Sequence, residues 1–262
     1  MNSCPVRGKI LIESFPARIF LQWYKISHMN ENRKILAFDT SSERGSVVLL
    51  EGDILRAELR SNTAAGHSTL LLEAADFMLK REGLTLKDLT LIAVGIGPGS
   101  FTGIRIGVAT GLGLSQSLGI PFVGVSGLDV LAHRAAQIND GRICILLDAR
   151  RGQFYFGEYE SKIGRLRRLR KPALINVSDV KNHLTDAEWI TGDLDKDQVR
   201  EIGEFFSRHA RWIPVDLFLA EGIGRLGFER KRMWRSGDFL IAEPLYIRPP
   251  DAVKNRRKTE KR

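Results

Sequence analysis

Cysteine and long apolar runs are scarce in this 262-residue sequence. The only two cysteines, Cys4 and Cys144, are too few for a disulfide framework and lack the spacing of a zinc site. No apolar run approaches the roughly 18 residues of a membrane span, and the apolar triplets near the N-terminus are too short for a signal peptide. These absences exclude membrane-spanning and disulfide-rich secreted classes, so we expect a cytoplasmic protein with no membrane partner.

Acidic residues are also in deficit, with 31 Asp and Glu against 40 Lys and Arg, a formal net charge of +9. Such an excess attracts polyanions when it is clustered. The basic residues gather in two places, at Arg165, Arg167, Arg168, Arg170 and Lys171 and in the tail 249–262. No aromatic side chains are interleaved to stack on bases, which favours a solvated loop and a disordered tail over an RNA site. Contact with RNA is therefore a secondary expectation.

Residues 1–33 differ from the rest of the sequence in having irregular apolar spacing and helix-interrupting prolines. Met29 directly precedes a short polar stretch and then a clean apolar run. We interpret 1–33 as a disordered extension or a mis-assigned start, with Met29 as the true first residue. A mitochondrial targeting segment is the alternative, disfavoured because serine is sparse and an Arg-rich amphipathic pattern is missing.

The pattern of apolar segments and turns predicts two α/β domains, at 34–125 and 126–248, the second reduced and with a C-terminal part that packs back on the first. The segment 143–156 repeats the opening pattern at 35–50: an apolar run, an aspartate, a polar turn and another strand. Asp39 and Asp148 occupy the same point of the two copies. Such a duplication resembles the actin/Hsp70-like (ribonuclease H-like) fold, in which mixed sheets carry packed helices and two aspartate turns face a nucleotide.

A glycine-rich segment carries Gly97, Pro98, Gly99 and Gly103 between an apolar strand and a helix. Its backbone N–H groups and the helix dipole could cradle a phosphate. The segment lacks the Lys-Ser/Thr ending of a Walker loop, and a plain tight turn is equally compatible with it. Together with Asp39, Thr40, Ser41 and Asp148, it forms the candidate nucleotide site, which is interpreted as vestigial.

The helix that follows has glycines at four-residue spacing, Gly103, Gly107 and Gly111. Interior glycines cost a helix about 1 kcal/mol each, so close approach of another backbone is expected along this stripe. That backbone belongs either to the same domain or to a partner chain. The preceding helix, expected at 67–81, is broadly apolar, as a surface used for association would be.

Five segments together resemble the TsaB (YeaZ) family, and the resemblance covers nearly everything from Lys34 to Asn255. They occur in this order: Ile35–Ser41, Gly97–Gly107, Pro121–Ser126, Asp148–Arg150 and Glu243–Arg248. The most specific is the Gly-Pro-Gly-Ser-Phe-Thr-Gly-x-Arg stretch that ends at Arg105.

This resemblance implies a noncatalytic subunit that binds and activates the TsaD-type transferase in tRNA threonylcarbamoyladenosine biosynthesis. The helices 67–81 and 103–118 would form a four-helix bundle with the equivalent pair on TsaD. The interface residues implied are His67, Leu70, Leu71, Ala74, Met78, Gly103, Ile104, Gly107, Val108 and Gly111. A TsaE-type ATPase would join the complex, and tRNA contact would be indirect or weak. The chain alone could self-associate as a homodimer, and the sequence leaves monomer and dimer open.

No catalytic or metal-binding residues are expected. Where the TsaD pattern has a metal-binding His-x-x-x-His pair, this sequence has Gly127 and Leu131, and His133 stands alone. No cofactor is expected either, although the two aspartate turns leave weak ATP or ADP binding at the partner interface open. The alternatives are an actin-like ATPase or small kinase and, with less support, a glycoprotease-type peptidase, for which no catalytic set can be assembled.

Overall fold

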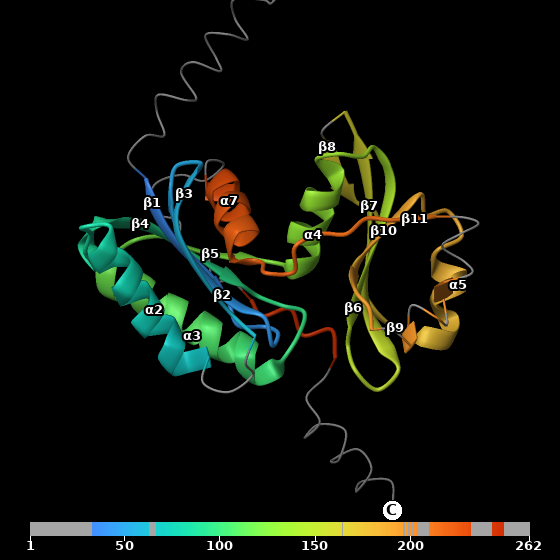
Figure 1. The fold of residues 1–262 in the computed structure, drawn as a ribbon, viewed down its shortest axis with the longest axis horizontal. Coiled ribbons are helices and arrows are strands. Elements are labelled where there is room, and N and C mark those ends of the chain that lie inside the picture. The colour runs from blue at the N-terminus through green and yellow to red at the C-terminus, as the bar shows by residue number, and fades with distance from the viewer. Residues whose placement is uncertain are drawn as a thin grey trace, which may run out of the picture.

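The computed structural model describes residues 33–62, 67–163, 165–195, 197–198, 200, 202–203, 210–231 and 243–248, and for residues 67–70 and 231 the description is limited to the backbone. The basic tail and, apart from Arg33, the predicted N-terminal extension lie outside these ranges. Two lobes make up the described part (Figure 1).

Lobe I is a five-stranded mixed sheet with the strand order β3-β2-β1-β4-β5. Its strands are β1 (Lys34–Asp39), β2 (Gly45–Glu51), β3 (Ile54–Ser61), β4 (Leu89–Gly95) and β5 (Phe122–Val125). Neighbours β1, β4 and β5 run parallel, whereas β2 is antiparallel to β1 and β3. Helices α2 (His67–Arg81) and α3 (Phe101–Leu118) cover one face of this sheet, with a 3-10 turn, η1 (Leu86–Asp88), leading into β4 (Figure 1).

Lobe II is built on a second mixed sheet with the order β8-β7-β6-β10-β11, and β9 also pairs with β7. Its strands are β6 (Gly141–Asp148), β7 (Gln153–Lys162), β8 (Arg165–Arg168), β9 (Ala173–Asn176), β10 (Trp189–Asp193) and β11 (Arg211–Trp212). The 3-10 turn η2 (Val177–Asp179) and helix α5 (Val180–His183) pack on the outer side of this sheet (Figure 1).

The two sheets share one plan. In each, the first strand pairs antiparallel with the second and parallel with a later strand, which in turn pairs parallel with the edge strand. The α/β class predicted from the sequence, with two mixed sheets and helices packed on them, is confirmed.

Strand β1 shows why the sheet of lobe I is buried on both faces. Successive side chains of a strand point to opposite sides. Leu36 and Phe38 belong to the core under α2 and α3, whereas Ile35 and Ala37 belong to the core on the opposite face. A continuous apolar run is therefore required, and this is the pattern of the sequence.

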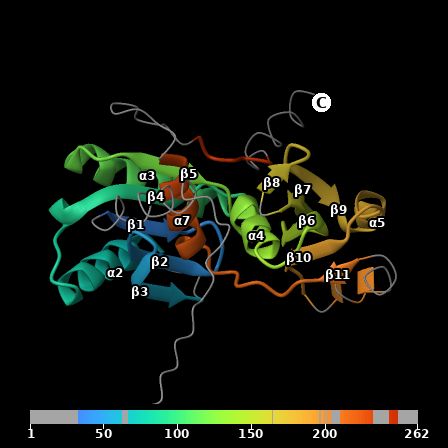
Figure 2. The same ribbon diagram turned by 90° about the horizontal axis from the view of Figure 1, so that it is seen from above.

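Two helices occupy the space between the lobes, α4 (Gly127–Ala136) and α7 (Ala220–Lys231) (Figure 2). Helix α7 packs on the sheet of lobe I, and α4 packs on both the sheet of lobe II and α7. One apolar core runs through them from β1 to β6, with Leu128, Ala132 and Ile223 fully buried. In the described ranges, no helix is long and apolar enough to cross a bilayer.

Candidate functional site

The two aspartates singled out by the repeat form the same local structure. Asp39 ends β1 and its Oδ1 accepts a hydrogen bond from the Ser41 amide at 3.2 Å. Asp148 ends β6 and its Oδ1 accepts one from the Arg150 amide at 2.8 Å. An aspartate that bonds the amide two residues ahead shapes a turn. Both aspartates therefore have a structural role that accounts for their position.

The glycine-rich segment is hydrogen-bonded to the turn that follows Asp39. The Ser100 amide donates to the Ser41 carbonyl at 2.7 Å, and the Thr40 hydroxyl donates to the Gly103 carbonyl at 2.7 Å. A Cβ on Gly99 would overlap the Ser41 carbonyl, and one on Gly103 would overlap that of Thr40. The glycines are needed because the segment lies directly against the turn.

The start of α3 is likewise satisfied within the chain. The Ser100 side chain caps the helix by accepting from the Gly103 amide at 3.2 Å. Asp39 is 1% exposed, and its second oxygen, Oδ2, accepts from the Ser41 hydroxyl at 3.0 Å. The turn after Asp39 and the glycine segment thus lie together, whereas Asp148 lies in lobe II and bonds Arg150 and Gln198. The polar groups of the turn and the segment bond one another, which favours the tight-turn interpretation. The ATPase and kinase alternative gains no support.

The glycine stripe of α3 faces its own sheet, so the partner interpretation of this stripe is wrong. A Cβ on Gly107 would lie 2.6 Å from Thr40 Oγ1, and one on Gly111 would lie 2.5 Å from Val94 Cγ2. These contacts are to β4 and to the turn after β1, inside lobe I. The backbone that the glycines admit belongs to the same domain.

Most of the other predicted interface residues are also unavailable to a partner. Leu71, Ala74, Met78 and Ile104 are at most 4% exposed because they fill the core between the helices and the sheet. Val108 is partly buried against the same core. The side chains of His67 and Leu70 lie outside the described residues.

The surface that α2 and α3 leave open is different from the predicted one. On α2, Leu72 and Phe77 are 49% and 60% exposed. On α3, Ala109 and Gly113 are exposed, and a Cβ on Gly113 would meet nothing within 4 Å. We call these four exposed residues the outer face. On α3, the four-residue spacing of Ala109 and Gly113, two positions away from the buried glycines, was the signal that sequence reasoning missed.

The positions that correspond to the metal-binding histidine pair are part of the core. Gly127 begins α4, where a Cβ would lie 2.9 Å from Leu219 Cδ1, and Leu131 is fully buried. Within the described part of the chain, no three His, Cys, Asp or Glu side chains are grouped so as to hold a metal ion.

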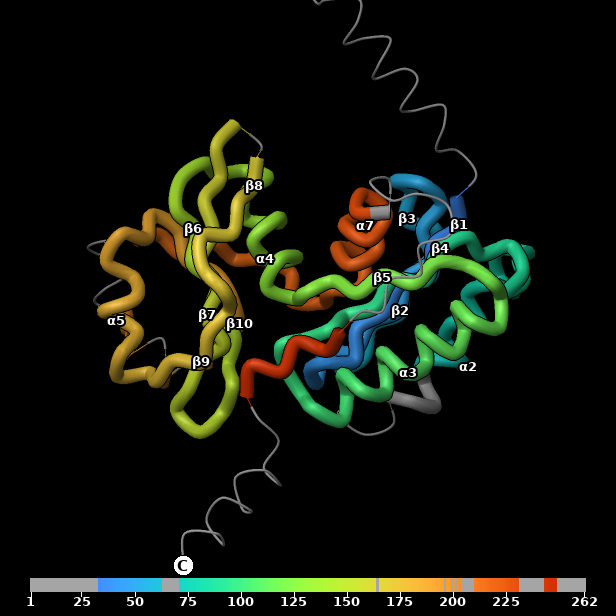
Figure 3. Tube along the Cα trace, turned by 180° about the vertical axis from the view of Figure 1, so that it is seen from behind, coloured from blue at the N-terminus to red at the C-terminus, as the bar shows by residue number. Residues whose placement is uncertain are grey.

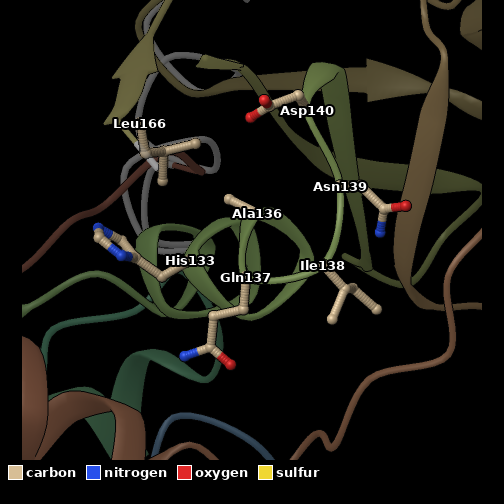
Figure 4. A pocket seen from close by; sticks show the side chains of 7 residues that line it. All are labelled: His133, Ala136, Gln137, Ile138, Asn139, Asp140 and Leu166. Atoms are coloured by element: carbon tan, nitrogen blue, oxygen red, sulfur yellow. The ribbon is translucent and has the colours of Figure 1, made fainter. Parts of the chain in front are cut away.

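A pocket of about 390 Å³ lies elsewhere, at the C-terminal end of α4 (Figure 4). It is lined by His133, Ala136, Gln137, Ile138, Asn139, Asp140 and Leu166. Burial lowers the pKa of His133, against the opposing charges of Glu229 and Asp129. None of the residues predicted for the nucleotide site or the interface lines this pocket.

The basic cluster around β8 is largely paired. Arg168 bonds Asp129 at 2.5 Å, Arg167 bonds Glu160 at 3.0 Å and Arg170 bonds Glu158 at 2.6 Å. Paired guanidinium groups have less charge to offer to phosphates. These pairs favour the interpretation of the cluster as part of the folded surface of lobe II.

The chain is similar in sequence to proteins of one tRNA-modification pathway. Residues 61–200 match the family model of TsaD, tRNA N6-adenosine threonylcarbamoyltransferase. The tRNA threonylcarbamoyladenosine biosynthesis protein TsaB of Bacillus subtilis is 37% identical over 180 residues, which cover 68% of this chain and 74% of that protein. TsaB of Buchnera aphidicola is 38% identical over 126 residues, covering 48% and 60%.

A solved structure agrees with these sequences. A Pseudomonas aeruginosa protein, described as similar to the peptidase YeaZ, superposes with a TM-score of 0.64 and 26% identity, covering 82% of this chain and all of that one. Sequence identity, coverage and fold point to one group of proteins, and the chain therefore belongs to the TsaB (YeaZ) family.

Proposed function

We propose that this chain is a noncatalytic subunit in tRNA threonylcarbamoyladenosine biosynthesis. It binds a TsaD-type transferase through the outer face of α2 and α3. This binding holds the transferase in its active arrangement. The observation that carries the proposal is the outer face itself, Leu72, Phe77, Ala109 and Gly113, combined with family membership.

The chemistry of the outer face favours a helical partner. Ala109 and Gly113 lie one turn apart on α3, where small side chains let a second helix approach closely. Leu72 and Phe77 lie five residues apart on the neighbouring helix, about 140° apart around its axis, and each exposes apolar area there. Exposed large apolar side chains are found at association surfaces. Small residues on α3 and exposed apolar side chains on α2 suit a partner that presents a pair of helices.

The interior of the candidate nucleotide site supports a noncatalytic role. The polar groups of Asp39, Thr40 and Ser100 are engaged in bonds that shape the glycine segment. The positions of the metal-binding histidines hold Gly127 and Leu131, whose surroundings are apolar. Metal-dependent catalysis of the TsaD type would need metal ligands at these two positions, where this chain has a glycine and a leucine packed in the core.

The experiment is co-expression of this chain with the TsaD-type protein of the same genome, followed by size-exclusion chromatography and by mass spectrometry of the modified tRNA nucleoside. Gly113→Leu and Phe77→Asp are expected to abolish co-elution and to lower the modified nucleoside at least tenfold. Ile138→Ser, which alters a residue 75% exposed on lobe II, is the matched control and is expected to leave both measurements unchanged.

Circular dichroism and thermal unfolding of each variant separate loss of binding from loss of fold. Co-elution of the folded Gly113→Leu and Phe77→Asp variants with the transferase, at the level of the unaltered chain, would overturn the proposed surface. Turnover of ATP or of the threonylcarbamoyl donor by the isolated chain would overturn the noncatalytic role.

The further members of the assembly are part of the same proposal. A TsaE-type ATPase joins the complex, tRNA contact through this chain is indirect or weak, and ATP or ADP binds at most weakly at the partner interface. Calorimetry of the isolated chain with ATP and magnesium tests the last point, and tight stoichiometric binding would contradict it.

A further inference from the structure

Two ion pairs join the lobes beside the two aspartate turns. Arg44, just before β2, forms two bonds to Asp193 at the end of β10, Nη1 to Oδ2 at 2.5 Å and Nη2 to Oδ1 at 3.2 Å. Arg150, two residues after Asp148, pairs with Glu43. Each pair connects a loop of lobe I to a loop or strand end of lobe II.

The segment 243–248, which we call the strap, makes a third connection (Figure 3). In lobe I, the Leu245 amide donates to the Ile96 carbonyl at 2.8 Å and the Tyr246 ring lies 4.9 Å from that of Phe101. In lobe II, Arg248 Nη2 donates to Gln153 Oε1 at 2.6 Å and to the Arg150 carbonyl at 3.3 Å. The strap therefore crosses from one lobe to the other.

These connections differ in kind from the α4–α7 core that also joins the lobes. This core is fully buried at Leu128, Ala132 and Ile223, and beside it Arg230 of α7 pairs with Asp129 of α4, whose side chain is 10% exposed. The side chains of the ion pairs remain in contact with water, at 36% and 34% exposed for Arg44 and Asp193 and at 73% and 60% for Arg150 and Glu43. Each solvent-accessible ion pair contributes little free energy, and salt screens the attraction between its charges. Apolar packing in the core is not screened by salt.

We propose that the ion pairs of Arg44 and Arg150, together with the strap, form a releasable latch, and that the lobes swing apart about the α4–α7 core when the latch opens. The strap also bonds α3, because Arg105 Nε donates to Tyr246 Oη at 3.2 Å. Arg105 lies one turn before Ala109 of the outer face, so the latch ties the position of lobe II to that surface. The latch is a property of the chain alone and stands independently of the proposed function.

The test measures the distance between the lobes in the full-length chain. Nitroxide labels are placed by Lys87→Cys in lobe I and Lys181→Cys in lobe II, both exposed, in a Cys4→Ser background. Burial raises the pKa of Cys144 to about 12, so its thiol stays protonated and unlabelled. Double electron–electron resonance is recorded with the labelled chain diluted in unlabelled chain, which removes distances between molecules.

At low salt the unaltered chain is expected to give one distance. The double variant Glu43→Gln, Arg44→Gln is expected to add a longer distance, with the open population rising about two- to fivefold for each pair lost. High salt should produce the same longer distance in the unaltered chain. The charge exchange Arg44→Asp with Asp193→Arg reverses the pair without removing it and is expected to keep the short distance, whereas Arg44→Asp alone is expected to add the longer one.

Arg56→Gln serves as the control, since it removes the pair with Glu82 inside lobe I at a side chain 44% exposed. Circular dichroism verifies that each variant is folded. If the folded double variant and the unaltered chain give the same distance distribution at low salt, or if Arg56→Gln produces the same broadening as the double variant, the latch is overturned.

Discussion

Asp129, in the first turn of α4, holds together elements from both lobes. Its Oδ1 accepts from Tyr159 Oη at 2.8 Å and from Arg168 Nη2 at 2.5 Å, and its Oδ2 accepts from Arg230 Nη2 at 2.6 Å. Arg230 belongs to α7 and the other two donors to β7 and β8. Burial by itself would raise the pKa of Asp129, but Arg168, Tyr159 and Arg230 together lower it below the ordinary value.

The first prediction concerns this carboxylate. Asp129→Asn is expected to lower the free energy of unfolding by about 2–4 kcal/mol at pH 7, because two guanidinium groups lose their counter-charge. Because the folded state lowers the pKa of Asp129, its charge stabilises the fold at pH values above the unfolded-state pKa of about 3.9. This stabilisation is lost as the pH falls through the folded-state pKa. The difference between the variant and the unaltered chain should therefore shrink below about pH 4.

Urea unfolding followed by circular dichroism at pH 7, 5 and 3 measures this difference. Asp76→Asn is the control, because Asp76 pairs with Lys80 at 62% exposure and its loss should cost under about 0.5 kcal/mol. An equal loss of stability at pH 7 and pH 3 would contradict the role given to the charge of Asp129.

Helix α3 has small residues on two sides, and the two sets do different things. Gly103, Gly107 and Gly111 let the helix lie against its own sheet, whereas Ala109 and Gly113 face outward. The two sets differ in what a Cβ would meet: the sheet and the turn after β1 for the first set, and nothing within 4 Å at Gly113. A sequence shows only that glycines recur every four residues.

The second prediction compares two alanine substitutions in this helix. Gly111→Ala is expected to lower the free energy of unfolding by about 1–3 kcal/mol, since the new Cβ would lie 2.5 Å from Val94 Cγ2 and 2.7 Å from Phe122 Cε2. Gly113→Ala is expected to raise it by about 0.5–1 kcal/mol, because alanine is the better helix former and nothing lies within 4 Å.

Chemical denaturation of both variants measures these opposite signs, and the unaltered chain provides the reference. A destabilising Gly113→Ala would mean that the outer face is covered within the chain. A neutral Gly111→Ala would mean that α3 stands farther from its sheet than the structure places it.

At the scale of the whole molecule, the third prediction is that the isolated chain forms a homodimer through the outer face. An apolar face that suits a related partner also suits a second copy about a two-fold axis. Light scattering after size-exclusion chromatography should give twice the mass of one chain at high concentration. Phe77→Asp should give a monomer, because the carboxylate would lose its hydration on association.

The TsaD-type partner should convert this homodimer to a one-to-one complex, since both associations use one surface. A heterocomplex that retains two copies of this chain in contact through α2 and α3 would contradict the shared surface. Ile138→Ser, on lobe II, should remain dimeric and serves as the control.

The sequence by itself determined the fold class, the repeat and the family. Runs such as Ile35–Phe38 must be buried on both sides, and the recurrence of Asp39 at Asp148 reflects one strand plan used twice. These features are local or periodic, so they can be seen along the chain. The sequence grouped Thr40, Ser41 and the glycine segment as one candidate site, and the parallel pairing of β1 with β4 is what brings them into contact.

Only the tertiary structure decided which side of each helix is covered. It placed the Gly103–Gly111 stripe against β4 and the turn after β1, left Phe77 and Gly113 open, and brought Arg44 to Asp193 across 149 residues of chain. Contacts at such separation depend on the packing of the two lobes. The physical reason is that a helical pattern fixes an angle around its own axis, whereas the neighbour at that angle is set by the rest of the fold.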